Sequence, residues 1–144
     1  MKIIFLDYDG VMNPQDTCIV FHKPWDAEFG KEAVKNLNYI IEQTGARVVV
    51  SATMRGSHKW TESLFKQNGI PVECYVGFTP YRNSRIRGEE IKTWLDTTIF
   101  KVESFVIVDD DNDMLDLKDH LVQTVNQNGL TFENAEKTIK ILND

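Results

Sequence analysis

Short apolar runs alternate along the chain with segments in which apolar residues recur every three to four positions. The continuous runs predict buried strands at residues 2–6, 47–51, 104–108 and 121–124, and a further strand is expected at 70–76. The helical period predicts helices over residues 31–44, 60–68, 89–95 and 132–142. The stretch 13–29 follows neither period and carries prolines, so we expect a loop or a small flap there. Strands that are apolar throughout and alternate with helices indicate an α/β fold, with a Rossmann-like parallel sheet and helices on both faces.

Composition sets limits on this picture. At 144 residues the chain is expected to form one domain that spans residues 1–144. The formal net charge of −6 argues against broad, nonspecific binding to nucleic acid or to acidic membranes, although it allows a local basic patch. The two cysteines, Cys18 and Cys74, lie far apart without metal-binding spacing, which favours free thiols. With no signal peptide and no apolar run of membrane-spanning length, no membrane partner is expected and the cytoplasm is the default location.

Reactive polar groups follow three of the predicted strands. Asp7 and Asp9 come directly after the first, Ser51 closes the second, and Asp109 and Asp110 follow the strand at 104–108. Because parallel strands bring their carboxyl ends to one edge of a sheet, we expect these groups to converge. Carboxylates that share a site raise one another's pKa values, and a hard divalent cation relieves their repulsion. Such oxygen ligands suit Mg²⁺, which commonly binds a few carboxylates together with a substrate phosphate.

Each of these groups also has a purely structural interpretation. Paired aspartates or a serine after a strand often cap a turn or a helix. The acidic run 109–113 can be a solvated loop or a helix N-terminus, where negative charge is favoured. Within this run the functional interpretation is favoured for Asp109 and Asp110 and the structural one for Asp111, while Asp113 is a candidate supporting residue.

Taken together, the motifs resemble those of the haloacid dehalogenase (HAD) superfamily of phosphohydrolases. The segment 7–11 (DYDGV) is similar to the first motif, Ser51 to the second, and the segment 108–110 (VDD) to the acidic fourth. The chain resembles more closely the small HAD domains associated with bacterial RNA-repair proteins. This closer resemblance lies in LDYDGVMN at 6–13, SATMR at 51–55, TP at 79–80, RGEEIKTWL at 87–95 and DDDNDM at 109–114.

The resemblance implies a role for each acid. Asp7 would be the nucleophile that forms an aspartyl-phosphate, and Asp9 would be the general acid and base. Mg²⁺ would be held by Asp7, by the backbone carbonyl of Asp9, and by Asp110 with Asp109 as the next candidate, since the sequence does not separate these two well.

The resemblance also implies which groups bind the phosphate. Ser51 and Arg87 would contact the phosphoryl oxygens and offset the charge that develops on them, and Arg55 and Arg85 are further candidates for substrate binding. Arg87 is the best match to the basic third motif near a helix start. Its competitors for that role are Arg82, Arg85 and Lys92.

The gaps between the motifs predict that no folded cap domain covers the site. Residues 13–30 are too few, and residues 56–85 are largely occupied by a helix and a strand of the main fold. An open crevice suits a phosphate on a large or extended substrate, and the resemblance implies a polynucleotide 3′-phosphate end. The expected function is therefore a Mg²⁺-dependent phosphatase that acts through an aspartyl-phosphate in nucleic-acid end processing. A phosphatase of nucleotides or other small phosphoesters is a second hypothesis, and a non-catalytic HAD-fold binding module is a third.

Overall fold

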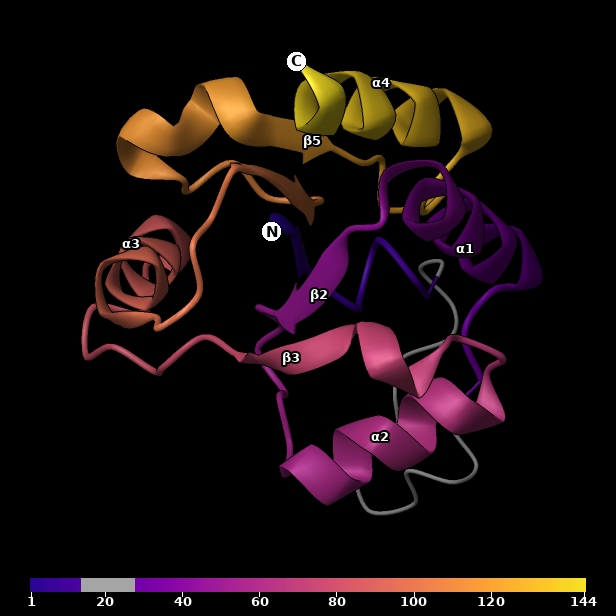
Figure 1. Ribbon diagram of the computed structural model, residues 1–144, viewed down its shortest axis with the longest axis horizontal. Helices are drawn as coiled ribbons and strands as arrows, with labels where there is room; N and C mark the ends of the chain where they lie inside the picture. The colour runs from indigo at the N-terminus through magenta and orange to yellow at the C-terminus, as the bar shows by residue number, and fades with distance from the viewer. Residues whose placement is uncertain (14–27) are drawn as a thin grey trace.

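The structure, a computed structural model, describes residues 1–13 and 28–144 (Figure 1). Its strands are β1 (Lys2–Leu6), β2 (Arg47–Val50), β3 (Tyr75–Phe78), β4 (Ser104–Asp109) and β5 (Leu121–Gln123). Its helices are α1 (Lys31–Thr44), α2 (His58–Gln67), α3 (Arg87–Thr97) and α4 (Phe132–Asn143), and two short 3₁₀ helices are η2 (Val72–Cys74) and η3 (Leu115–His120).

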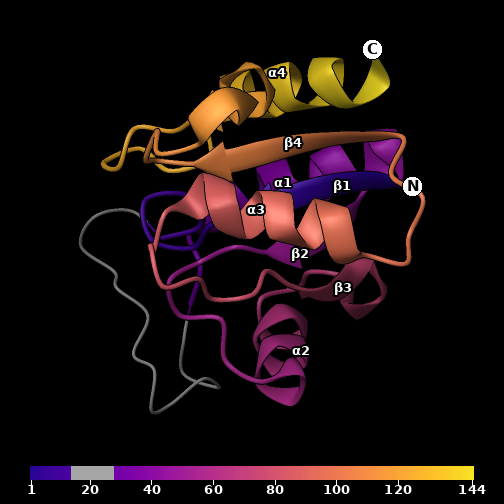
Figure 2. The same ribbon diagram turned by 90° about the vertical axis from the view of Figure 1, so that its left-hand side faces the viewer.

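The strands form one parallel sheet in the order β3-β2-β1-β4-β5. The last residue of β1, Leu6, lies opposite Val50 of β2 and Val108 of β4. This register brings the residues that follow β1, β2 and β4 to the same level, at the edge of the sheet away from the N-terminus in Figure 2. The predicted Rossmann-like α/β fold is confirmed.

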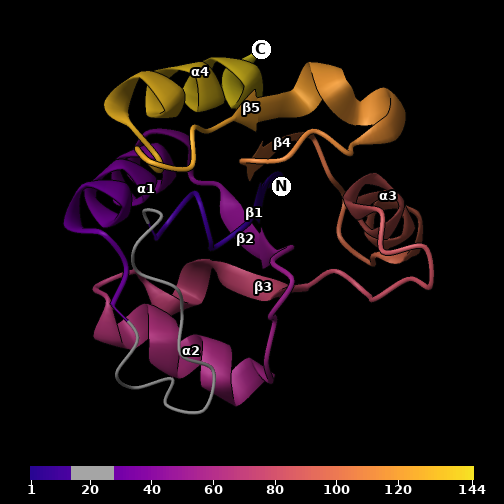
Figure 3. The ribbon, with the colours of Figure 1, turned by 180° about the vertical axis from the view of Figure 1, so that it is seen from behind.

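Alternate residues of β1 face opposite helical layers. Ile4 and Leu6 pack in one apolar cluster with residues of α1, α2 and α4, whereas Ile3 and Phe5 pack in another with Trp94 of α3. These four of the five side chains of β1 are fully buried, and each such burial contributes about 1.5–3 kcal/mol to folding. Figures 1 and 3 show α1 beside α4 on one side of the sheet and α3 on the other. The prediction of helices on both faces is confirmed as well.

The predicted strand at 70–76 is wrong over most of its length. Its apolar residues alternate, as they do in a half-buried strand, but Pro71 has no N–H for a ladder and its carbonyl accepts the N–H of Cys74 (3.1 Å). The chain therefore forms η2 there, and β3 begins only at Tyr75. The short helix η3 was not expected from the sequence, since it buries no residue and follows no apolar period.

The gap between the second and third motifs is filled by the main fold, as predicted. It holds α2, whose Leu64 and Phe65 are fully buried in the core, and β3, which is a strand of the sheet. The expected absence of a cap in the first gap falls largely on residues 14–27, outside the described residues.

Two further expectations concern cysteines and membranes. Cys74 is a buried free thiol whose pKa is raised to about 12, chiefly by burial, while Cys18 lies outside the described residues. Within residues 1–13 and 28–144, none of the helices has the length and apolarity needed to cross a membrane.

Candidate functional site

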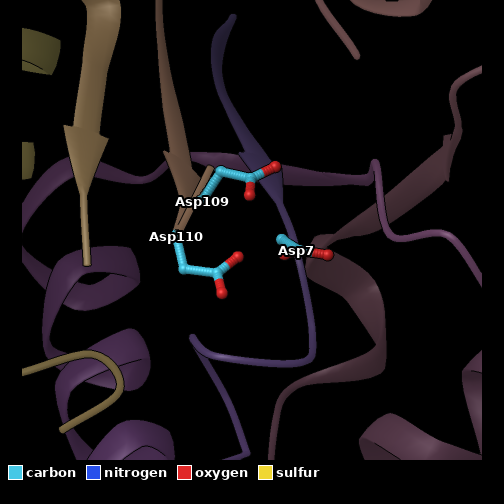
Figure 4. A group of neighbouring side chains, drawn as sticks. All are labelled: Asp7, Asp109 and Asp110. Atoms are coloured by element: carbon cyan, nitrogen blue, oxygen red, sulfur yellow. The ribbon is translucent and has the colours of Figure 1, made fainter. Parts of the chain in front are cut away.

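Three carboxylates meet at the carboxyl edge of the sheet. Asp7 follows β1, Asp109 ends β4, and Asp110 comes next in the chain. One oxygen of each lies within 4.8 Å of the others, and Figure 4 shows the three side chains gathered beyond the two strand ends. The N–H of Asp7 donates to the carbonyl of Val108 (3.1 Å), so strand pairing continues past β1 and holds Asp7 beside Asp109.

Burial dominates the electrostatics of this group. The side chains of Asp7 and Asp109 are only 9% and 1% exposed, so water does little to stabilise their charges. Burial, and then the charge of Asp109, raises the pKa of Asp7 to about 9, although Arg87 opposes the rise. Burial also raises the pKa of Asp109 to about 6, again against the effect of Arg87. The pair therefore holds a proton at neutral pH in the metal-free protein.

Arg87 is the cation of the site. Its Nη1 lies 3.7 Å from Oδ1 of Asp7 and 3.9 Å from Oδ2 of Asp109. This nitrogen is buried and has no hydrogen-bond partner among the described residues. The other terminal nitrogen, Nη2, donates to Oγ1 of Thr53 (3.3 Å). Nη2 is thus anchored by a hydrogen bond, while Nη1 faces the carboxylates and donates no hydrogen bond to any described residue.

The position of Arg87 depends on where α3 begins. The sequence predicted that this helix begins at residue 89, but it begins at Arg87. The N–H of Arg87 donates to Oδ2 of Asp113 (3.1 Å). The next residue, Gly88, donates its N–H to the carbonyl of Asp113 (3.0 Å), and a Cβ there would lie 2.6 Å from the backbone of Met114. The acidic run thus holds the end of the helix that carries Arg87.

Asp110 is half-buried and held from two sides. Its Oδ2 accepts from the side-chain amide of Asn126 (3.1 Å), and its carbonyl accepts from that of Gln123 (3.1 Å). Gly10, at φ 82°, passes so close that a Cβ on it would lie 2.3 Å from Oδ2 of Asp110. Only glycine allows both this backbone conformation and this approach.

Asp9 lies in the same pocket but apart from the three carboxylates. The pocket has a volume of about 180 Å³, and Asp7, Asp9 and Arg87 are among its walls. Asp9 is exposed, and its Oδ1 accepts from the side-chain amide of Asn13 at 3.4 Å. Its carboxylate is thus free to reach a proton on a bound molecule.

The other predicted phosphate-binding residues are not among those that line this pocket. Ser51 follows β2, donates its backbone N–H to the carbonyl of Leu6 (2.9 Å) and is fully buried, with no hydrogen-bond partner for its Oγ among the described residues. Arg55 is buried in an ion pair with Glu90 (2.5 Å) and donates to Oγ1 of Thr79 (3.1 Å). Arg85 is exposed on the segment between β3 and α3 and does not line the pocket.

Two residues to which the sequence assigned no role support the site. Glu90 of α3 is buried and accepts from Arg55, lies 3.9 Å from Nε of Arg87, and accepts the backbone N–H of Arg82 (3.1 Å). The spacing of Arg87 and Glu90, three residues apart on a helix, was a signal for this contact. Thr53, which anchors Arg87, had no signal beyond its place in the SATMR segment.

This donor set fits a hard divalent cation. Oδ2 of Asp109 is buried without a hydrogen-bond partner among the described residues, and the three grouped side chains offer only carboxylate oxygens. Oxygen ligands of this kind suit Mg²⁺. Such an ion would be held by Asp7, Asp109 and Asp110, and a phosphate beside it would meet the unused Nη1 of Arg87.

Comparison with known proteins identifies one family. The family model described as "HAD domain in Swiss Army Knife RNA repair proteins" matches residues 3–135, a range that includes the pocket and the whole sheet except Lys2, the first residue of β1. Comparisons with curated proteins and with solved structures gave no significant match.

Proposed function

The chain belongs to the family of HAD domains in Swiss Army Knife RNA repair proteins, and from this premise we propose that it is a Mg²⁺-dependent phosphomonoester hydrolase. The observation that carries the proposal is the pairing of a buried carboxylate with an unused donor. Asp7 lies 3.7 Å from Nη1 of Arg87, which has no hydrogen-bond partner among the described residues. A phosphoryl group placed against Asp7 offers this nitrogen the acceptor that it lacks.

Asp7 acts as the nucleophile. A carboxylate oxygen of Asp7 attacks phosphorus, forming an O–P bond while the bond from phosphorus to the leaving oxygen breaks. Arg87 binds a phosphoryl oxygen and offsets the negative charge that builds up in the transition state. Asp7, Asp109 and Asp110 would hold Mg²⁺, which would supply further charge neutralisation and favour the ionised form of Asp7.

Asp9 acts as the acid and base. Its exposed carboxyl group, in the same pocket as Asp7, gives a proton to the leaving oxygen, which departs as an alcohol. In the second half of the reaction Asp9 takes a proton from a water molecule that attacks the phosphorus of the aspartyl-phosphate. The O–P bond to Asp7 breaks, and the products are inorganic phosphate and the original carboxylate.

The proposed substrate is the terminal phosphate of a large molecule, first of all a polynucleotide 3′-phosphate end. The segment between the second and third motifs contributes a helix and a strand to the main fold rather than a cover for the pocket. The family's association with RNA repair proteins supports this choice of substrate.

Phosphate release tests the proposal. With Mg²⁺, the purified chain should hydrolyse a generic aryl phosphate and a 3′-phosphorylated oligonucleotide, and EDTA should abolish both activities. Asp7→Asn should remove the activity, whereas Asp96→Asn, an exposed aspartate near the far end of α3, should retain it. Wild-type turnover by Asp7→Asn would show that another group is the nucleophile.

A second measurement separates an enzyme from a binding module. Beryllium fluoride mimics an aspartyl-phosphate and should raise the melting temperature of the wild type only when Mg²⁺ is present. If Mg²⁺ alone stabilises the protein, beryllium fluoride adds nothing and no phosphate is released, then the site holds a cation without catalysis.

A further inference from the structure

A second hollow adjoins the pocket of Asp7. It has a volume of about 490 Å³ and is lined by the segment that joins β3 to α3 (Figure 1), including Tyr81, Arg82 and Arg85. Thr53 and Arg87 line both hollows, so the two share a wall. We call the second hollow the arginine groove. A molecule whose phosphate sits against Asp7 can pass over this wall into the groove.

Tyr81 is an exposed aromatic ring that is nevertheless held in place. Its hydroxyl donates to the carbonyl of Thr53 (3.0 Å), and the guanidinium carbon of Arg55 lies 4.0 Å from the ring centroid. The residue is still 63% exposed, so the open area comes from the other face and the edges of the ring. A fixed ring with a free face can stack against a flat group at little cost in side-chain entropy.

Arg82 and Arg85 supply positive charge beside this ring. Both are exposed, and neither guanidinium has an ion pair or a hydrogen bond within the part of the chain that the structure describes. Their backbones are fixed, because Glu90 accepts the N–H of Arg82 and the carbonyl of Arg82 accepts the N–H of Arg85 (3.0 Å). In a chain of net charge −6, these unpaired arginines mark the groove as an anion-binding surface.

We propose that the arginine groove is a nucleotide subsite, in which a base stacks on Tyr81 while Arg82 and Arg85 contact a backbone phosphate. The proposal rests on the phosphohydrolase function proposed above and names its substrate class as a single-stranded nucleic-acid end. An unpaired base can stack on the free face of the Tyr81 ring, and the next phosphodiester carries the negative charge that the unpaired arginines can bind. A phosphopeptide has neither of these at a regular spacing.

Dependence on substrate length tests the subsite. The substrates are an aryl phosphate, a nucleoside 3′-monophosphate, 3′-phosphorylated oligonucleotides of increasing length, their 5′-phosphorylated counterparts and a phosphopeptide. For the wild type, kcat/KM should rise about tenfold or more from the mononucleotide to a short oligonucleotide and then level off, because one further base and phosphate fill the groove. The comparison of the 3′ and 5′ series shows which end enters.

Variants of the groove test the residues. Tyr81→Ala should lower the ratio of kcat/KM on the oligonucleotide to kcat/KM on the aryl phosphate by about 5- to 150-fold, the range for loss of one stacked base. Arg82→Gln and Arg85→Gln should lower the same ratio and weaken its dependence on salt. Lys140→Gln, which removes an exposed positive charge on α4, is the matched control and should leave the ratio unchanged. If Tyr81→Ala does not fold, Arg82→Gln and Arg85→Gln still test whether the groove binds the oligonucleotide.

Failure of the subsite and failure of the proposed function give different results. If the wild type hydrolyses the aryl phosphate but kcat/KM neither rises with length nor depends on these residues, the subsite is wrong and the hydrolase stands. A phosphopeptide turned over more efficiently than every oligonucleotide would likewise overturn the subsite. If the wild type hydrolyses none of these substrates, binding of a fluorescent oligonucleotide tests whether the groove binds nucleic acid. Weaker binding by Tyr81→Ala and Arg82→Gln than by Lys140→Gln supports the groove without catalysis, and equal binding refutes it.

Discussion

Nη1 of Arg87 lies 3.7 Å from Oδ1 of Asp7 and donates no hydrogen bond to any described residue. A buried donor without an acceptor costs folding free energy, as does a buried carboxylate beside a second one. The phosphoryl group and the cation proposed above would relieve both costs. The arrangement is therefore less favourable for the free protein than for its complex, which is the usual character of a functional site.

Arg87, and not its competitors, should serve as the basic residue of the third motif. Arg87→Gln should reduce kcat/KM on an aryl phosphate by about 100-fold or more, because it removes a donor to the transition state. Lys92→Gln is the control on the same helix, since Lys92 pairs with Asp116 at the surface, and it should change kcat/KM less than about twofold. Steady-state kinetics at saturating Mg²⁺ measures both. A larger loss in Lys92→Gln would move the role to that residue.

The metal-free protein should lose stability as the pH rises. Because the pKa of Asp7 is about 9 when folded and about 3.9 when unfolded, the folded state binds the proton more tightly. The protonated Asp7 makes its full contribution to the free energy of unfolding below pH 4, and this contribution is lost as the pH rises towards 9. In EDTA, Asp7→Asn should raise the melting temperature at pH 8 by roughly 2–5 °C and flatten its fall between pH 5 and 9. Melting curves of the two proteins in EDTA measure this, and identical curves would contradict it.

The fold was predictable because its strands are short, apolar throughout and followed by polar residues. For β1 and β4 this pattern also places Asp7 and Asp109 at one edge, since a parallel sheet aligns the ends of its strands. The strand predicted at 70–76 failed because the alternation of its apolar residues could not show that Pro71 turns the chain into η2.

The rest of the site depends on contacts between distant segments, for which a single sequence carries no signal. Glu90 pairs with Arg55 across 35 positions, and Tyr81 is anchored to Thr53 across 28. Arg55, a candidate for substrate binding, pairs with Glu90, and its guanidinium also lies over the ring of Tyr81.

Adding a single methyl group at Gly10 should disturb the proposed cation site. Gly10→Ala places a Cβ 2.3 Å from Oδ2 of Asp110, so the carboxylate must move, and we expect Mg²⁺ affinity to fall by about tenfold or more. Gly45→Ala is a matched control, because Gly45 has a similar φ of 69° but nothing within 4 Å of its added Cβ. Both variants should lose about 1–2 kcal/mol of stability from the backbone alone. Titration of Mg²⁺ by calorimetry distinguishes them, and equal affinities would show that Asp110 is not a ligand.

Asp113 should act through Arg87 rather than on the substrate. Its Oδ2 accepts the backbone N–H of Arg87, so Asp113→Ala should shift the start of α3 and lower kcat/KM on an aryl phosphate by about tenfold, with a loss of roughly 1 kcal/mol in stability. Asp113→Asn retains an acceptor oxygen and should therefore keep most of the wild-type kcat/KM and most of the wild-type stability. In an Arg87→Gln background, Asp113→Ala should still lower the melting temperature but should change kcat/KM little, because the group that it positions is gone. A full and independent loss of kcat/KM in that background would show that Asp113 has a role of its own in the reaction.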